Sequence, residues 1–474
     1  MITYLLLLAY YSLFVWLTWR HVRWGLFLVI GLLSSYMIRF AVGGLPTTLL
    51  EGMIGLLFIV WLIKMKKEKN LSFNLKVWLN NPVRDSQNPI PPKLRLPMVL
   101  FLVASTISVF VAPDIPVAAG IWKAYFIEPL MFLIVFVYTL RTAADLRKAL
   151  SCLGLTVLVI GLIALMQKLT GALIPNPFWA EAAGRRVTTV FGYPNATALF
   201  VLPVIFLTLG QAIFNLRSAA LNNLKLKSQD YFFLIFNIIV LVLGTLTILW
   251  TKSTGALLGL AAGLLCLLLV YKKTRLVVLW FILLGLIVSL VSPAVINKMQ
   301  NTYASANEIR LAQHPSDLQI RVQMWRETLA MLKDTPILGA GLAGYQTLIK
   351  PYHANQHLEI FLYPHNVFLN FWTEMGLLGL IAVVWILMVF FMMIGRSLIF
   401  DLRHHQPDKT ADYILTISAL SAMLATLIYG LVDVPYFKND LAVEFWMVVG
   451  IIIIINNRGQ AAKYKKETIA NEQN

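Results

Sequence analysis

The stretch MGLLGLIAVVWILMVFFMMIG, residues 375–395, contains no charged side chain. An apolar run of about 20 residues is long enough to cross the hydrocarbon core of a bilayer as one helix. The whole chain repeats this pattern, because 59% of its 474 residues are hydrophobic, 13% are charged and the mean hydropathy is +0.75. This composition excludes a soluble globular domain and predicts an all-α polytopic membrane protein.

We predict about twelve to thirteen transmembrane helices. Their ranges are 2–19, 24–43, 46–64, 96–113, 117–140, 148–168, 190–215, 231–251, 253–272, 276–297, 374–396, 412–432 and 441–456. The first run lacks a basic n-region and a small-residue cleavage site, so we expect a retained span rather than a removed signal peptide. Thirteen spans place Met1 outside the cell, whereas twelve place both ends inside.

The predicted organisation has four parts. They are an N-terminal transmembrane bundle (1–297), an outer loop domain (298–364), C-terminal transmembrane helices (365–456) and a basic cytoplasmic tail (457–474). The loop domain has its own apolar periodicity, at Ile320, Met324, Leu329 and Leu332, which predicts a partly helical cap on the membrane bundle.

The net charge of +17 is not a nucleic-acid signal, because the basic residues lie in the connectors between apolar runs. They occupy every second connector, at 20–23, 64–69, 141–148, 216–227, 272–275, 396–405 and 463–466. The positive-inside rule therefore places these connectors in the cytoplasm and the others outside. Both cysteines, Cys152 and Cys266, lie inside apolar runs, so we expect neither a disulfide framework nor a thiolate metal site.

Charged residues at membrane depth gather on the outer side in this topology. They are Arg39, Glu51, Lys123, Glu128, Lys252, Asp433, Lys438 and Asp440, with Arg185, Arg186, Arg321, His365 and Glu374 on the outer loops or their junctions. Such residues are costly in a bilayer and are candidate functional groups. The alternative is that Lys and Arg side chains only reach out to water, which fits less well for Lys123 and Arg39, each more than one turn inside an apolar run.

The charge pattern predicts a cation-rich cavity that is open to the outer face. Its natural ligand is an anion at the lipid surface, and the planar guanidinium of Arg suits a phosphate through paired hydrogen bonds. A diphosphate headgroup carried by a polyprenyl lipid fits this description.

The segment FLYPHNVFLN, residues 361–370, puts His365 where the outer loop enters the membrane. A histidine is suited to act as a base near neutral pH. We expect Asn366 to orient the imidazole or to bind a sugar hydroxyl. Pro364 disfavours helix at Tyr363 and suits a helix start, which predicts a short helix over 366–375. The alternative for His365 is a surface histidine or a helix cap.

Four segments resemble, in order and spacing, the signatures of the O-antigen ligase and polymerase superfamily. They are GRRVTTVFGYPNATALF (184–200), TKSTGALLGL (251–260), IRVQMWRETLAMLKDTPILGAGLAGYQ (320–346) and YPHNVFLNFWTEMGLLGL (363–380). The resemblance covers roughly 184–440, and the first 140 residues match only in hydropathy. The sequence GYPN departs from the more frequent GNPN of the family.

The resemblance implies a membrane glycosyltransferase of the C type in the inner membrane of a bacterium. Such enzymes move a glycan from undecaprenyl diphosphate to an acceptor hydroxyl on the outer face, by an inverting displacement without metal or other cofactor. The acceptor is lipid A–core in the ligases, which we favour here, and another lipid-linked repeat unit in the polymerases.

By motif, the implied catalytic residues are His365, Arg186 and Arg321. Further candidates for binding the diphosphate or the substrate are Arg185, Lys123, Lys252, Arg39, Asn366, Asn195 and Tyr363. The adjacent Arg185 and Arg186 cannot both point the same way on a regular element, and we favour Arg186. The alternative for Arg321 is a solvated face of an amphipathic helix.

Other interpretations remain open at this point. A zinc site of His353, His357 and His365 lacks the glutamate of HExxH. An oxygen-ligand metal site of Asp433, Asp440, Glu374 and Glu51 has no DxD pattern beside it. A transporter or flippase needs cations in the cytoplasmic half as well, and a non-catalytic scaffold leaves the arginines and the histidine unexplained. The glycine-rich GAGLAG (339–344) predicts a turn rather than a phosphate cradle, since no strand precedes it.

Overall fold

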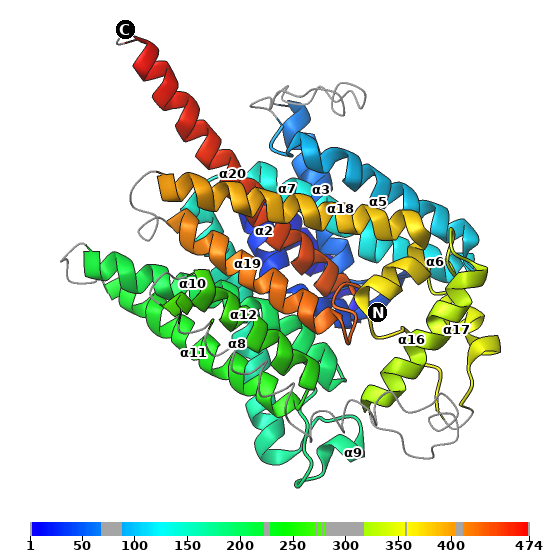
Figure 1. Cartoon of the computed structure of the whole chain (residues 1–474). Helices are drawn as coiled ribbons and strands as arrows, with labels where there is room; N and C mark the ends of the chain where they lie inside the picture. The colour runs from blue at the N-terminus through cyan, green and yellow to red at the C-terminus, as the bar shows by residue number, and fades with distance from the viewer. Residues whose placement is uncertain are drawn as a thin grey trace.

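The computed structural model describes residues 2–67, 88–221, 228–270, 274–276, 279, 317–355, 358–403 and 411–472. Over these ranges the chain is a bundle of long helices with smaller helices at one end (Figure 1). The α-helices are α1 (Ile2–Arg20), α2 (Val22–Gly31), α3 (Leu49–Lys67), α5 (Pro92–Val111), α6 (Ile115–Trp122), α7 (Glu128–Thr139), α8 (Ala143–Thr170), α9 (Pro177–Ala180), α10 (Pro194–Leu221), α11 (Ser228–Thr251), α12 (Thr254–Val270), α16 (Asp317–Asp334), α17 (Tyr345–Leu348), α18 (Val367–Arg403), α19 (Ala411–Gly430) and α20 (Asn439–Glu472).

Eight helical segments in the described part of the chain are long and apolar enough to cross a membrane. They are Pro92–Val111, Ile115–Thr139, Ala143–Thr170, Pro194–Arg217, Tyr231–Thr251, Val367–Ile399, Ala411–Gly430 and Asn439–Gln460. This confirms the prediction of an all-helical polytopic membrane protein. The predicted span 276–297 lies almost wholly outside the described residues.

The predicted span 24–43 is wrong. The helix α2 ends at Gly31, and a 3₁₀ turn (Leu33–Met37) leads into a hairpin of β1 (Arg39–Val42) and β2 (Leu45–Thr48). The turn of the hairpin is Gly43-Gly44, with φ of 59° and 83°. Two successive residues with positive φ match the right-handed twist of a two-residue hairpin, and only glycine adopts them freely. A hydropathy average over this stretch does not register that local turn.

The helices α10 and α20 lie at the centre of the bundle, while α11 lies at its periphery. An aromatic cluster joins α5, α18 and α20 near the loop end: the ring of Phe101 contacts those of Phe371, Tyr436 and Trp446, and the ring of Phe371 also contacts that of Tyr436. Close approach of α12 to α19 requires Gly259, where an added Cβ would lie 2.7 Å from the carbonyl oxygen of Ala425. Small residues at such crossings are typical of membrane helices.

The two ends of the bundle differ in chemistry. One end, the loop end, carries the β1–β2 hairpin, the segments 317–355 and 358–366 and the turn 431–438. The other, the basic end, carries the starts of α2, α8 and α19, with the ion pairs Arg23–Asp145 at 3.4 Å and Arg458–Asp412 at 2.7 Å.

A small partly helical unit packs on the bundle at the loop end, where α16 and α17 lie beside the start of α18 (Figure 1). Its own apolar core consists of Met331, Leu332, Ala340, Tyr345 and Ile349. The GAGLAG segment is a turn, as predicted. The backbone N–H of its Ala340 donates to the carbonyl oxygen of Thr373 at 2.6 Å, which ties the unit to α18.

The first part of α18 is a separate short helix. Gly376 interrupts the helix with φ 66° and ψ −175°, so the chain forms one helix from Val367 to about residue 375 and a second one beyond it. This confirms the short helix predicted over 366–375, which leads the loop into the membrane span.

Candidate active site

His365 occupies the junction between the loop unit and α18. Its φ of 46° lies in the left-handed region, which is uncommon for a residue other than glycine. Asn366 follows it and caps α18: its Oδ1 accepts from the N–H groups of Phe368 and Leu369, both at 3.1 Å, and its Nδ2 donates to Leu431 O at 3.1 Å. Because these bonds occupy both polar atoms of the amide, Asn366 positions the backbone at the site and does not contact the imidazole.

Asp433, on the turn between α19 and α20, is the residue that contacts the imidazole. Its Oδ1 lies 3.3 Å from Nδ1 of His365, and the two side chains are 8% and 26% exposed. Burial acts to raise the pKa of Asp433, but the hydrogen bond and charge of His365, the N–H of Val434 and the charge of Arg321 together hold that pKa below its ordinary value. Asp433 is therefore an ionised carboxylate that fixes the ring through Nδ1. No residue in the described part of the chain hydrogen-bonds Nε2 of His365.

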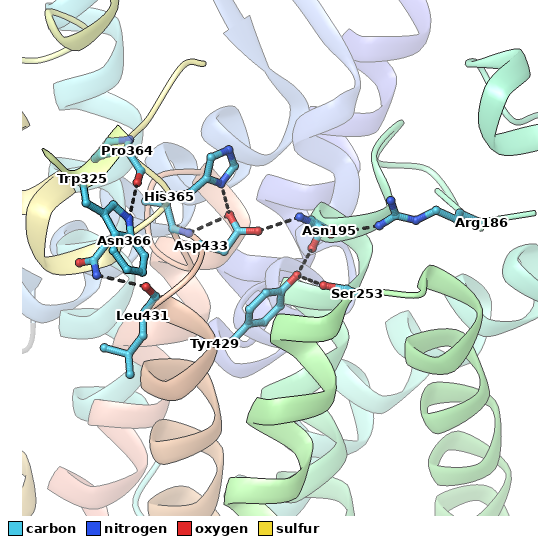
Figure 2. A network of polar contacts seen from close by, with 11 residues as sticks. Arg186, Asn195, Ser253, Trp325, Pro364, His365, Asn366, Tyr429, Leu431 and Asp433 are labelled. Atoms are coloured by element: carbon cyan, nitrogen blue, oxygen red, sulfur yellow. Dashed lines mark hydrogen bonds and ion pairs between the residues drawn. The ribbon is translucent and has the colours of Figure 1, made fainter. Parts of the chain in front are cut away.

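Asn195 connects this pair to Arg186 (Figure 2). Its Nδ2 donates to Asp433 Oδ2 at 3.0 Å, and its Oδ1 accepts from Nη2 of Arg186 at 3.4 Å. Arg186 in turn donates from Nε to the carbonyl oxygen of Thr251 at 2.7 Å. Three segments far apart in the sequence thus hold one polar chain that ends at the imidazole: the α8–α10 loop with the start of α10, the end of α11 and the α19–α20 turn.

Tyr429 and Ser253 support this chain from below in Figure 2. The hydroxyl groups of Ser253 and Tyr429 lie 2.8 Å apart, and the Tyr429 hydroxyl donates to the carbonyl oxygen of Asn195 at 3.4 Å. Both side chains are buried, so these hydrogen bonds fix the backbone of Asn195 in a region where a displaced polar group would be costly.

Arg321 reaches the same site from α16. The side chain four residues later, Trp325, donates from Nε1 to the carbonyl oxygen of Pro364 at 3.0 Å, directly before His365. Residues at i and i+4 share one face of a helix, so this bond turns the Arg321 face of α16 toward His365. The charge of Arg321 is also one of the causes that lower the pKa of Asp433. Asp433 therefore contacts His365 directly and Arg186 through Asn195, and the charge of Arg321 acts on it.

The predicted cations Arg185 and Lys252 do not join this group. Arg185 donates from Nη1 to the carbonyl oxygens of Lys168 and Leu169, at 2.8 and 3.2 Å, and from Nε to that of Ala180 at 3.0 Å. It therefore caps the C-terminal end of α8. Lys252 lies exposed in the α11–α12 turn with φ 53°, and its side chain makes no hydrogen bond or ion pair to the residues that the structure describes.

A second polar cluster at the loop end accounts for Lys123. Its Nζ lies 2.7 Å from Glu51 Oε2, and Glu51 also accepts from Thr47 at 3.0 Å and from Asn439 at 3.1 Å. Lys123 is thus already neutralised by a carboxylate from another helix.

Arg39 and Tyr363 lie near this second cluster. Arg39 is exposed on β1, and its charge acts on Lys438, whose pKa is lowered by burial despite the nearby Asp440 and Asp433. The ring of Tyr363 contacts that of Phe437 at 5.8 Å, and burial raises its pKa well above the ordinary value. The charge of Lys438 is therefore affected both by Asp433, which contacts His365, and by Arg39, near the second cluster.

The sequence identified Asp433 as one of the outer charged residues and as a possible metal ligand, but it did not indicate the contact with His365. The two residues are 68 positions apart, and no spacing rule links an aspartate in one connector to a histidine in another. The sequence did indicate that Asp433 and His365 both lie on the outer side of the membrane. The anchoring role of Trp325 had no signal in the sequence beyond its place on the Arg321 face of a predicted helix.

The metal alternatives gain no support from the described residues. Both ring nitrogens of His353 are in use, Nδ1 with Glu327 Oε2 at 3.1 Å and Nε2 with the carbonyl oxygen of Leu358 at 3.0 Å, while His357 lies outside the described ranges. Glu374 accepts from the N–H of Ala343 at 2.6 Å and so anchors the loop unit to α18. Within the ranges that the structure covers, no three His, Cys, Asp or Glu side chains are grouped closely enough to hold a metal ion.

The fold and this site define a polytopic membrane protein with an imidazole, a carboxylate and two arginines at one end of its helical bundle. Residues 239–384 match the family model described as O-antigen ligase. Over these residues the chain is similar to that family, and the resemblance seen in the sequence is confirmed there. The matched region includes Arg321 and His365, whereas Arg186, Asn195 and Asp433 lie on either side of it.

A curated relative also matches part of the chain. It is an uncharacterized protein of Haemophilus influenzae that is 26% identical over 172 residues, which are 34% of this chain and 43% of that protein. The aligned part spans less than half of either protein.

Proposed function

We propose that the protein is a glycosyltransferase that moves a glycan from undecaprenyl diphosphate to an acceptor hydroxyl at the outer face of the bacterial inner membrane. The observation that carries the proposal is the contact of Asp433 with His365 beside Arg186 and Arg321. One imidazole nitrogen is held by a carboxylate and the other has no partner among the described residues. Asn195 links the same carboxylate to Arg186, and the charge of Arg321 acts on it. This is the set of groups that displacement of a diphosphate by an alcohol requires.

In the proposed reaction the acceptor oxygen attacks the anomeric carbon from the face opposite the diphosphate. The new carbon–oxygen bond forms while the bond from that carbon to the diphosphate oxygen breaks, so the configuration inverts. The hydroxyl proton passes to Nε2 of His365, and the carboxylate of Asp433 stabilises the resulting imidazolium through Nδ1–H. The bonding electron pair leaves with the polyprenyl diphosphate.

Arg186 and Arg321 have the role of stabilising the departing diphosphate. Its negative charge grows as the bond to the sugar breaks, and cations fixed beforehand stabilise that charge most strongly where water is excluded. Arg186 is fixed by its bonds to Thr251 and Asn195, which leave its other terminal nitrogen, Nη1, for a phosphate oxygen. No metal or other cofactor takes part in this scheme.

The location of the site follows from the distribution of basic residues. The end opposite His365 carries Arg23, Arg147, Lys148 and Arg458, among others, and a basic end faces the cytoplasm under the positive-inside rule. The loop end then faces the periplasm or the cell exterior, where lipid-linked glycans are presented.

The acceptor that we favour is lipid A–core or a similar envelope hydroxyl, as in a ligase of lipopolysaccharide biosynthesis. The matching family model carries the ligase description, which supports this choice over the alternative, an O-antigen or exopolysaccharide polymerase that uses a second lipid-linked unit. A transporter of the lipid-linked glycan has less support, because the buried side chains along the middle of α10, such as Phe200, Val204 and Leu207, carry no charge.

The test is reconstitution of the purified protein in liposomes with a glycan on undecaprenyl diphosphate, with and without EDTA. Lipid A–core as acceptor gives a product of lower gel mobility in both conditions, and a His365→Gln protein gives none. A ladder formed from the donor alone supports the polymerase instead. Loss of activity in EDTA that added metal restores contradicts metal-independent transfer, and absence of any new glycosidic product refutes the proposed function.

A further inference from the structure

We propose that the protein binds one anionic phospholipid at the basic end of its bundle, in a cavity between α2, α8, α10 and α11. This site lies at the opposite end from His365. The proposal goes beyond the glycosyltransferase function and does not depend on it.

The cavity has a volume of about 650 Å³. Polar residues come from three helices: Arg23 from α2, Arg147 and Lys148 from the first turns of α8, and Gln211 from α10. A cavity of this size accommodates a phosphate with its glycerol backbone, since small-molecule sites in proteins span about 300–1,000 Å³.

The charge of the lining favours an anion. It contains the permanent cations Arg23, Arg147 and Lys148 against one carboxylate, Asp145. The carboxylate is already used: its Oδ2 accepts from the N–H and the hydroxyl of Thr142, at 3.2 and 2.7 Å, and its Oδ1 lies 3.4 Å from Arg23. Asp145 therefore caps α8, and the cationic excess of the cavity is not cancelled.

The donors of two of these cations are unused by the described residues. The guanidinium of Arg147 packs over the ring of Phe214 at 5.0 Å and makes no side-chain hydrogen bond to that part of the chain. Gln211 fixes the helix beneath it by donating to the carbonyl oxygen of Arg147 at 2.9 Å. Lys148 likewise has no ion pair with a described residue. A positioned guanidinium beside an ammonium group is suited to a phosphate.

The apolar part of the lining indicates a lipid rather than a soluble anion. Trp24, Phe27 and Phe233 line the same cavity as the cations. Below it, α8 presents Leu155, Val159 and Leu162 on one face, each about half exposed, and α11 presents Ile235, Ile239 and Val242. The spacing by three or four residues makes each set a continuous stripe. Acyl chains can follow these stripes toward the bilayer centre while the phosphate stays among the cations, as basic pockets between membrane helices do for anionic lipids.

A free thiol in the cavity lining provides a direct probe. Cys152 lines the cavity, and the other cysteine, Cys266, is buried on α12. A Cys266→Ala protein therefore reports the accessibility of Cys152 alone. The experiment places it in nanodiscs of phosphatidylcholine, with or without phosphatidylglycerol, and measures the rate at which a water-soluble maleimide labels Cys152. Retained lipid is measured by native mass spectrometry of the same samples.

The variant is Arg147→Gln with Lys148→Gln, and the matched control is Lys66→Gln with Lys93→Gln. The control changes the net charge equally and alters residues on α3 and α5 that do not line the cavity. In the Cys266→Ala protein and in the control, phosphatidylglycerol is expected to slow the labelling of Cys152 several-fold and to remain bound. The affinity for phosphatidylglycerol falls about tenfold or more in the variant, because each cation near the headgroup strengthens binding by a factor on the order of five.

Three outcomes overturn the proposal. Labelling rates that are equal in both lipid compositions show that no anionic lipid occupies the cavity. Equal protection by inorganic phosphate in phosphatidylcholine nanodiscs shows a site for a soluble anion rather than for a lipid. Equal loss of bound phosphatidylglycerol in the variant and the control shows a diffuse charge effect. None of these measurements uses glycan transfer, so the outcome is separate from that of the proposed function.

Discussion

Oδ1 of Asp433 lies 3.3 Å from Nδ1 of His365, across 68 residues of chain. The turn between the last two helices thereby holds an imidazole that belongs to the entrance of α18. A ring held through Nδ1 presents Nε2 in a fixed direction, and a carboxylate at Nδ1 stabilises the imidazolium that forms when Nε2 takes a proton. Substitutions at this contact and at its supports therefore have distinct expected effects.

Replacement of His365 by Gln removes the proposed base. We expect kcat for glycan transfer to fall about 10²- to 10⁴-fold, the range that general acid–base catalysis contributes. The KM for the lipid-linked donor changes little, because the arginines still bind the diphosphate. Initial rates in liposomes measure both constants, and thermal unfolding followed by tryptophan fluorescence checks that the variant is folded. A folded variant with unchanged kcat refutes the assignment of the base.

Replacement of Asp433 by Asn tests its positioning role through pH. The pKa of Asp433 is lowered in the folded state, despite burial, by its contacts with His365, Val434 and Arg321. A lowered pKa means that the carboxylate contributes stability above its unfolded value of about 4, and that this contribution is lost as the pH falls through the lower folded value.

The amide side chain of the Asp433→Asn protein does not titrate, so the expected results differ with pH. At pH 7 this protein has a lower Tm than the wild type, and the gap narrows as the pH is taken below about 4. Its kcat falls about tenfold or more while the donor KM stays close to normal. A Tm gap that does not change with pH shows that the charge of Asp433 is not what stabilises this turn.

Arg185 and Arg186 are neighbours with different contacts, and exchange of each for Gln separates their roles. Arg186→Gln removes a cation from the active site and is expected to raise the donor KM about 10- to 100-fold, the equivalent of about 1.5–3 kcal/mol for a charged hydrogen bond. Arg185→Gln removes the cap of α8 instead. It lowers the free energy of unfolding by about 1–3 kcal/mol and leaves the donor KM within about twofold.

Both proteins differ from wild type by the same charge, so each is the control of the other. Donor titrations in detergent–lipid micelles give KM, and urea or thermal unfolding gives stability. If Arg185→Gln has the larger effect on donor KM, the assignment of the two arginines is reversed.

The membrane architecture was predictable from sequence because hydrophobic length is a property of consecutive residues. Runs such as 96–113 and 231–251 correspond to α5 and α11 within a few residues. The stretch 24–43 was mispredicted because Gly43 and Gly44 turn the chain through positive φ, which a hydropathy average does not contain. Hairpin formation there depends on two residues rather than on the composition of twenty.

For the candidate site, the sequence predicted only the side of the membrane on which it lies and the types of residue that form it. Arg186, Arg321 and His365 were identified from motifs, and the charge pattern placed them on one side. Their partners were not predictable, because a pair such as Asn195 and Asp433 depends on how α10 packs beside the turn after α19. The same limit applies to Arg185 and Asn366, whose side chains turn to backbone atoms of nearby helix ends.

The last prediction concerns the bond that attaches α16 to the histidine. Nε1 of Trp325 donates to the carbonyl oxygen of Pro364 at 3.0 Å, and Trp325→Phe removes this donor while keeping most of the aromatic volume. One neutral hydrogen bond contributes about 0.5–1.5 kcal/mol. If that energy fixes the position of Arg321 relative to His365, kcat falls about 2- to 10-fold with little change in expression.

The chain supplies a matched control for this change. Trp372 donates from Nε1 to the carbonyl oxygen of Pro336 at 2.7 Å, the same pair of groups at another attachment of the loop unit to α18. Trp372→Phe is expected to lower Tm by an amount similar to that of Trp325→Phe while it leaves kcat unchanged. Tm and initial transfer rates are measured for both proteins in parallel. Equal losses of kcat in the two proteins mean that the loop unit only needs to be attached, whereas a loss confined to Trp325→Phe means that this bond positions the site.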